Sequence, residues 1–276
     1  MGSLITAVAS YLDARFNNGK WLIRTEDLDP PREIAGASDA IITALAQHGL
    51  VSDAPILKQS ERLDAYEAAI TALTQLGRAY LCRCSRSELR DSNGIYPGYC
   101  RDKNLSHNQQ LATRLIVNDE TITYHDGIQG LMSQSLGRDI GDFVIKRKDQ
   151  LHSYQLAVVI DDAFQGITHV VRGADLLDST ERQIFLADQL NYPRIQFSHL
   201  PVLTNALGQK LSKQTFAPII DNSRVMVNLR FALAFLNQPS APQHIVTSGE
   251  ILAWSAQHWD IGRIAKKQHH YSPLPT

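Results

Sequence analysis

Apolar residues recur at every third or fourth position in several parts of the chain, which is the pattern of a helix with one buried face. Leu4, Val8, Leu12 and Phe16 form the first such stripe, and Ser3 is a suitable N-cap before it. The same pattern predicts further helices over residues 37–49, 60–77, 153–166, 178–190, 225–236 and 250–259.

Short apolar runs lie between these stripes and predict strands over residues 21–25, 142–147, 167–173 and 195–203. Helices that alternate with buried strands favour an α/β fold with an open parallel sheet. Residues 81–140 are polar and rich in turns, which is typical of a small insertion. We therefore expect residues 1–80 and 141–220 to form one domain, with 81–140 inserted into it and a helical segment over 221–276.

Composition and charge narrow the possible classes of protein. The 276 residues are 43% hydrophobic, which is enough for a sizeable core, and no stretch of about 18 apolar residues predicts a membrane helix. With no basic segment before the first amphipathic helix, we expect no signal peptide and a cytoplasmic location.

The net charge is −1, so a nucleic-acid partner would need a local basic patch. Lys146–Lys148 and Lys266–Lys267 with Arg263 are candidates, although either could be an ordinary solvated face.

The only cysteines of the chain, Cys82, Cys84 and Cys100, lie close together within the expected insertion. An odd number of clustered thiols favours a structural metal site over a disulfide, the alternative being reduced cysteines that only pack. Three thiolates leave a tetrahedral zinc site one ligand short. Candidates for the fourth ligand are Tyr96, Tyr99, Asp91, Asp102 and His107. Ligand chemistry alone favours His107.

Lys210, Ser212 and Lys213 lie in a polar loop just after the last predicted strand. Two ammonium groups that flank a hydroxyl can neutralise a polyphosphate, and ligands of open α/β sheets bind at the carboxyl ends of strands. Gly2 stands at the start of the first helix, where free backbone N–H groups favour an anion. Each feature taken alone is equally compatible with a solvated loop and an ordinary helix start.

Five stretches occur in a characteristic order over residues 1–216: "GSL", "RTEDLDPPRE", "CRC" followed by "Y" and "C", "YQLAVVIDDAFQGITHVVRGADLLDSTERQ", and "KLSKQ". In order and spacing they resemble the catalytic half of class I glutamyl-tRNA synthetases, and most of all the short paralogues, the glutamyl-queuosine tRNA(Asp) synthetases. The resemblance implies a Rossmann-like ATP-binding domain with a zinc-bearing insertion.

The resemblance also implies roles for individual residues. It makes Tyr96 the fourth zinc ligand beside the three cysteines, in place of His107. Glu26 matches the residue that binds the amino group of glutamate, and Tyr154 and Arg172 match the remaining glutamate contacts. The corresponding structural alternatives are an ion pair of Glu26 with Arg24, a half-buried core position for Tyr154, and an ion pair of Arg172 with Asp175.

The loop and the helix start acquire roles in the same way. Lys210, Ser212 and Lys213 match the loop that holds the ATP phosphates, the two lysines being the catalytic candidates, and Gly2 joins them at the nucleotide. Asp161 and Asp162 also match the family, but we assign them no role beyond a structural network at a strand end.

The implied reaction activates L-glutamate with ATP, accompanied by Mg²⁺, and transfers it to the queuosine base at the wobble position of tRNA(Asp). Catalysis then rests on positioning and charge neutralisation, because carboxylate attack on phosphorus needs little acid–base help. The 63 residues after Lys213 cannot build the anticodon-binding domain of a full glutamyl-tRNA synthetase. We expect a monomer. The alternatives are a non-catalytic tRNA- or nucleotide-binding protein and a zinc-dependent nucleic-acid adaptor.

The sequence departs from the family at its start. The family's first strand and its H-x-G-S or H-x-G-H signature precede the first helix, whereas here Met1 already stands on the "x" of that signature. We therefore expect Met1 to be an internal methionine, with the natural start about 15–20 residues upstream. The alternatives are a degenerate relative and an engineered fragment. Without such a segment, the 276-residue chain is expected to have low stability and little adenylation activity.

Overall fold

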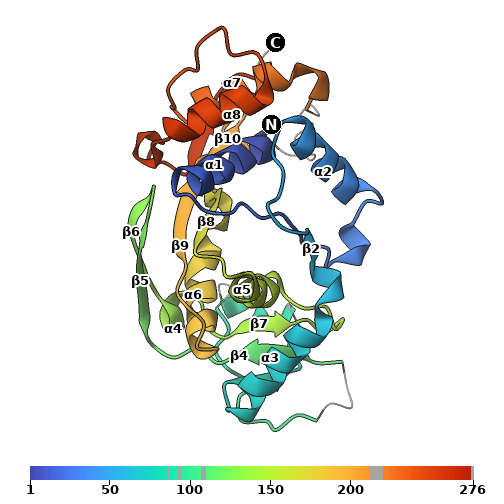
Figure 1. The fold of residues 1–276 in the computed structure, drawn as a ribbon. Coiled ribbons are helices and arrows are strands. Elements are labelled where there is room, and N and C mark those ends of the chain that lie inside the picture. Colours follow the sequence, from blue (N-terminus) through green and yellow to red (C-terminus); the bar gives the residue numbers. More distant parts are fainter. Residues whose placement is uncertain (86, 93–94, 107–109, 212–219, 275–276) are drawn as a thin grey trace.

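The computed structural model describes residues 1–85, 87–92, 95–106, 110–211 and 220–274. Helices gather at one end of the molecule, together with both termini (Figure 1). These helices are α1 (Gly2–Phe16), α7 (Val225–Phe235) and α8 (Ser248–Gln257). They share a core with Trp21, Leu50 and Leu203, beside the parallel pair β10 (Val202–Thr204) and β11 (His269–Tyr271). The C-terminal segment is therefore part of the same hydrophobic core as the first helix.

A second core lies at the other end of the molecule (Figure 1). Its antiparallel sheet has the order β3 (Ala79–Cys82), β4 (Ala112–Leu115), β7 (Phe143–Lys146). Its helices are α3 (Leu63–Gln75), α5 (Tyr154–Gln165) and α6 (Thr180–Gln189). The predicted insertion thus contributes β4 to a sheet whose other strands lie at its borders.

Two strands connect the cores. The parallel pair β8 (His169–Gly173) and β9 (Gln196–Leu200) runs between them (Figure 1). The hairpin of β5 (Thr121–Asp126) and β6 (Gly130–Ser135) lies against β9, and the short α4 (Leu136–Asp139) follows it. An element of the insertion therefore lies beside the central strands.

A third parallel pair consists of β1 (Arg24–Thr25) and β2 (Leu57–Lys58). Within the described residues β1 pairs only with β2, and β8 only with β9. A cleft of about 740 Å³ lies between α1, the segment Gly19–Glu26 and the segment Thr168–Val171. The helix α2 (Ala37–Gln47) buries none of its residues, although Leu45 packs against the core around α1.

Several predictions of local structure are confirmed. The helix predicted over residues 153–166 spans Tyr154–Gln165, with the Ser153 hydroxyl capping it and Gly166 at a φ of 65° ending it. The strand predicted over residues 167–173 is β8. The predicted tail helices are α7 and α8, and α8 begins with a capping box between Thr247 and Glu250.

Other predictions are wrong in part. Ser3 does not cap the first helix, which begins at Gly2. Phe16 is 52% exposed, because it is the last residue of the helix and lies beyond its buried turns. The helix predicted from Ser60 begins at Leu63, since Ser60 bonds Asp27 from a 3₁₀ turn. Of the strand predicted over residues 21–25, only Arg24–Thr25 pairs.

The sheet also differs from the prediction. Parallel pairing occurs in separate two-stranded pairs, while the strand predicted over residues 142–147 pairs antiparallel with β4. The sequence pattern missed β4, β5 and β6 because their apolar runs are short. No helix in the described ranges is long and apolar enough to cross a membrane.

Candidate active site and metal centre

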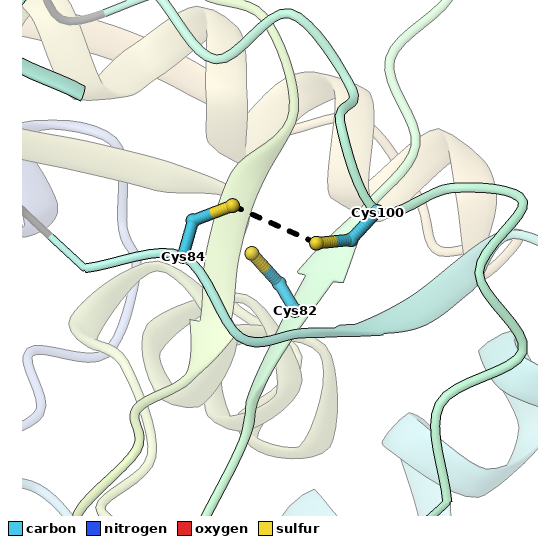
Figure 2. Close-up of side chains that lie close together, drawn as sticks. All are labelled: Cys82, Cys84 and Cys100. Carbon is cyan, nitrogen blue, oxygen red and sulfur yellow. Dashed lines mark hydrogen bonds between the residues drawn. The ribbon is translucent and has the colours of Figure 1, made fainter. Parts of the chain in front are cut away.

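Three thiols and a phenol converge in the inserted segment. Figure 2 shows the side chains of Cys82, Cys84 and Cys100 pointing toward one another. The Sγ atoms of Cys84 and Cys100 are 3.6 Å apart, and all three sulfurs lie within 4.8 Å of one another. The Tyr96 hydroxyl lies 3.3 Å from Cys82 Sγ and 3.4 Å from Cys84 Sγ. These cysteines could hold a metal ion.

The spacing of these atoms fits a tetrahedral zinc ion. With zinc–sulfur bonds of about 2.3 Å and a zinc–oxygen bond of about 2.0 Å, neighbouring sulfurs would be about 3.8 Å apart and an oxygen about 3.5 Å from each sulfur. Cys82, Tyr96 and Cys100 are buried, so a bound ion would be shielded from water. Of the other candidate ligands, Tyr99 is 57% exposed, and His107 lies outside the described residues.

A buried arginine borders this metal centre. Arg114 Nε donates to Cys82 Sγ at 3.3 Å, and its guanidinium lies 3.9 Å above the Tyr96 ring. Burial raises the pKa of the Cys84 thiol. Burial opposes ionisation of Cys100 as well, yet hydrogen bonds from the Tyr96 hydroxyl and a backbone amide hold the pKa of that thiol at about 7. These donors favour the thiolate of Cys100, the form that binds metal.

The ends of β1 and the middle of α5 form an acidic and basic cluster. Arg24 donates to Asp162 Oδ1 at 2.7 Å and to Gln165 Oε1 at 2.9 Å, whereas Glu26 Oε1 is 3.6 Å from it. The ion pair between Arg24 and Glu26, the structural alternative for Glu26, is thus present only as a weak contact. Burial would lower the pKa of Arg24, but Asp162 and Glu26 raise it. Arg24 takes Asp162 as its main partner and leaves 41% of the Glu26 side chain exposed.

Arg172 of β8 is 7% exposed, and its hydrogen-bond partners are neutral groups. Its Nη1 donates to Gln183 Oε1 at 2.8 Å and more weakly to the Tyr154 hydroxyl at 3.4 Å, and its Nη2 donates to Thr180 Oγ1 at 2.9 Å. Burial raises the pKa of Tyr154, Arg172 opposes that rise, and the charge of Glu26 adds to it. The structure therefore brings Glu26, Tyr154 and Arg172 into one electrostatic neighbourhood.

The alternative of an ion pair between Arg172 and Asp175 is wrong. Asp175 instead accepts from Lys210 Nζ at 2.6 Å, next to the turn in which Gly208 has a φ of 76°. Ser212 and Lys213 lie outside the described residues. Gly2 begins α1, and apart from its chain neighbours no side chain of the described residues approaches within 4 Å of the position that a Cβ would take there.

The aspartate pair lies within α5 and not at a strand end. Asp161 is fully buried and accepts from Gln59 Nε2 at 2.9 Å, Arg62 Nε at 2.8 Å and the Tyr66 hydroxyl at 2.6 Å. Burial raises the pKa of Asp162, and Arg24 opposes this rise. Asp161 therefore ties α5 to α3, whereas Asp162 orients the arginine beside Glu26.

Sequence reasoning missed the residues that surround Arg172, namely Asp126, Thr180, Gln183 and His199. Thr180 and Gln183 belong to "TERQ", which ends one of the stretches that resemble the family, so the resemblance could have pointed to them. Asp126 and His199 carried no signal, because 73 residues separate them and only the packing of the hairpin on β9 brings them together.

Comparisons with known proteins agree with this fold. Residues 1–237 match the family described as "tRNA synthetases class I (E and Q), catalytic domain". The glutamate-tRNA synthetase of Elizabethkingia anophelis superposes on 99% of this chain with a TM-score of 0.80 at 23% identity. The chain spans 65% of that structure's length. The fold is that of a class I aminoacyl-tRNA synthetase catalytic domain.

Curated relatives define the family more narrowly. A glutamyl-Q tRNA(Asp) synthetase of Pseudomonas paraeruginosa is 48% identical over 96% of this chain and 91% of its own length. One of Neisseria meningitidis serogroup C is 47% identical over 96% of this chain and 93% of its own length. The chain therefore belongs to the glutamyl-Q tRNA(Asp) synthetase family, and it is a ligase.

Proposed function

We propose that this protein activates glutamate with ATP and transfers it to the queuosine base of tRNA(Asp). The observation that carries the proposal is that Arg172 is buried and, among the described residues, has no carboxylate within ion-pair distance. The chain is also 45–48% identical to proteins named glutamyl-Q tRNA(Asp) synthetase. A buried guanidinium that has only neutral partners favours an anionic ligand. The names of the relatives give no support to a non-catalytic binding protein.

The proposed roles follow from the chemistry of glutamate. Arg172 would bind the side-chain carboxylate through two N–H groups, and Tyr154 would contribute its hydroxyl. Glu26, which is left partly exposed while Asp162 occupies Arg24, would bind the α-amino group. The α-carboxylate then attacks the α-phosphorus of ATP and pyrophosphate leaves.

The nucleotide side of the site is proposed from the loop and the first helix. Lys210, Ser212 and Lys213 would neutralise the phosphates, with the N-terminus of α1 at Gly2 as a further anion site. Lys210 would exchange its ion pair with Asp175 for the phosphates on ATP binding. Mg²⁺ would accompany ATP.

We also propose that the metal of the insertion is zinc, held by Cys82, Cys84, Cys100 and Tyr96. Its role would be structural, because four protein ligands leave no open position for substrate. One chain carries every residue proposed for the reaction, so a monomer suffices.

Transfer of labelled glutamate tests the proposal. The chain is incubated with ATP and with tRNA(Asp) prepared with and without queuosine, with tRNA(Glu) as a further acceptor. Label on queuosine-containing tRNA(Asp) alone is the expected result. Label on tRNA(Glu) would contradict the proposed acceptor, and exchange of pyrophosphate that depends on another amino acid would contradict the proposed substrate. Repeating the assay with the native upstream codons tests whether residues before Met1 contribute.

A further inference from the structure

Two fully buried residues without an assigned role, His199 and Asp126, continue the hydrogen bonding of Arg172 away from the proposed ligand site. Arg172 Nε donates to His199 Nε2 at 3.0 Å, and His199 Nδ1 lies 2.5 Å from Asp126 Oδ2. The His199 and Asp126 side chains are both 0% exposed. Asp126 comes from the hairpin of the insertion, His199 from β9 and Arg172 from β8.

The hydrogen-bond partners fix the proton of the imidazole. Arginine N–H groups are donors only, so His199 Nε2 must accept and the proton must reside on Nδ1, where Asp126 accepts it. Asp126 Oδ1 accepts in addition from the backbone N–H groups of Ile128, Gln129 and His199 at 3.0, 2.8 and 3.1 Å. These bonds hold Asp126 as a carboxylate, and Asp126 in turn fixes the imidazole proton of His199 on Nδ1.

This arrangement keeps the carboxylate one residue away from Arg172. A carboxylate in direct contact would occupy the terminal N–H groups that a ligand needs. The neutral imidazole instead takes only Nε, and on the terminal nitrogens two contacts are long, 3.4 Å to the Tyr154 hydroxyl and 3.4 Å to the Leu176 carbonyl. The two N–H groups that make these long contacts can donate to a ligand carboxylate instead, at little cost in free energy.

We propose that Asp126 and His199 are positioning residues for glutamate, which orient Arg172 by fixing the imidazole tautomer. The inference rests on the proposed function, because it assigns the ligand of Arg172 as the glutamate side chain. The inference also gives the hairpin β5–β6 a part in amino-acid recognition, through Asp126.

The variant Asp126→Asn tests this inference with the smallest change of shape. The asparagine oxygen can keep the three backbone bonds, while its amide N–H₂ faces His199 Nδ1. His199 must then carry its proton on Nε2, which points an N–H at the Arg172 Nε–H. We expect the dissociation constant and KM of glutamate to rise by about 10- to 100-fold, with the KM of ATP unchanged.

Two further variants separate positioning from stability. In Asp126→Asn/His199→Gln the glutamine oxygen can accept from Arg172 Nε without any tautomer, so glutamate affinity should return to within about 5-fold of wild type. The matched control is Asp142→Asn, an equally buried carboxylate that bonds Arg101, Tyr80 and the Val117 amide but not Arg172. It should change glutamate affinity by less than about 2-fold.

Calorimetric titration measures the dissociation constant of glutamate, and glutamate-dependent pyrophosphate exchange measures its KM. The variants are made in the 276-residue chain or in the chain with the upstream codons, whichever binds glutamate. Wild-type affinity in Asp126→Asn, or a double variant weaker than the single one, would overturn the inference and leave the proposed function intact. If neither wild-type form binds glutamate, the proposed function fails and this inference fails with it.

Discussion

At the scale of single residues, neighbours in sequence have separate tasks in this protein. Asp161 and Asp162 are adjacent, yet one bonds α3 and a preceding 3₁₀ turn while the other orients Arg24. Successive side chains on a helix point about 100° apart, so adjacent residues face different neighbours. The sequence indicated that both residues matter but could not separate a structural carboxylate from one that shapes the site.

The variant Tyr66→Phe should lower the free energy of unfolding by about 1–3 kcal/mol, because it removes one of three donors to a buried carboxylate. Tyr66 and Asp161 are both 0% exposed, and their bond is 2.6 Å long. Urea unfolding followed by circular dichroism measures the effect. Tyr271→Phe, at a tyrosine that is 53% exposed, is the control and should change stability by less than about 0.5 kcal/mol. Equal losses in the two variants would contradict this account of Asp161.

At the scale of elements, side chains join the antiparallel sheet of β3, β4 and β7 to the helices around it. His152, which forms an isolated bridge to Lys146 of β7, bonds Glu67 of α3 through Nε2 at 2.8 Å. Burial lowers the pKa of His152, and Glu67 opposes this effect. The imidazole is therefore held neutral between β7 and α3.

The burial of His152 should make stability fall in mild acid. The folded pKa of His152 lies below its unfolded value of about 6.5, so the unfolded chain takes up the proton first as the pH falls through that value. Its contribution is complete above about pH 6.5 and is lost below it. Urea midpoints at pH 7.5 and 5.5 should differ less in His152→Gln than in wild type. His169→Gln, at an exposed histidine, should keep the wild-type difference.

The proposed zinc ion should stabilise the insertion. Because Cys82, Tyr96 and Cys100 form a small separate cluster, removing zinc should lower the melting temperature and release amide protection there first. Metal analysis should find one zinc ion per chain, and Cys84→Ser should lower this content, whereas Ser133→Ala on the exposed face of the hairpin should not. A metal-free protein with unchanged protection would show that the thiols only pack.

At the scale of the whole molecule, the C-terminal segment belongs to the core of the first helix. Trp259 is 3% exposed and donates from Nε1 to Asp13 Oδ1 at 3.1 Å, across nearly the full length of the chain. Leu12 of α1 and Ile251 of α8 are buried in the same cluster. The match to the synthetase family ends at residue 237, but the folded unit extends through α8 and Trp259.

Trp259→Ala should therefore destabilise the molecule by about 3–5 kcal/mol, because it empties a buried site between α1 and the C-terminal helices. Trp254, which is only partly buried and stacks on His258, provides the control. Its replacement by alanine should cost less than about 1.5 kcal/mol. Chemical unfolding at one temperature measures both variants, and similar losses would mean that the tail is not part of the cooperative core.

The sequence by itself determined the local elements and the chemical types of the candidate residues. Periodicity is a property of neighbouring residues, so α5, β8 and the tail helices followed from it, and the order of the motifs carried the family. Tertiary packing decided the rest. Antiparallel pairing of β7 with β4, the choice of Asp162 over Glu26 as the partner of Arg24, and the contact of Asp126 with His199 all join residues far apart in the chain. Such contacts depend on which buried groups must satisfy one another, and that is settled only when the chain folds.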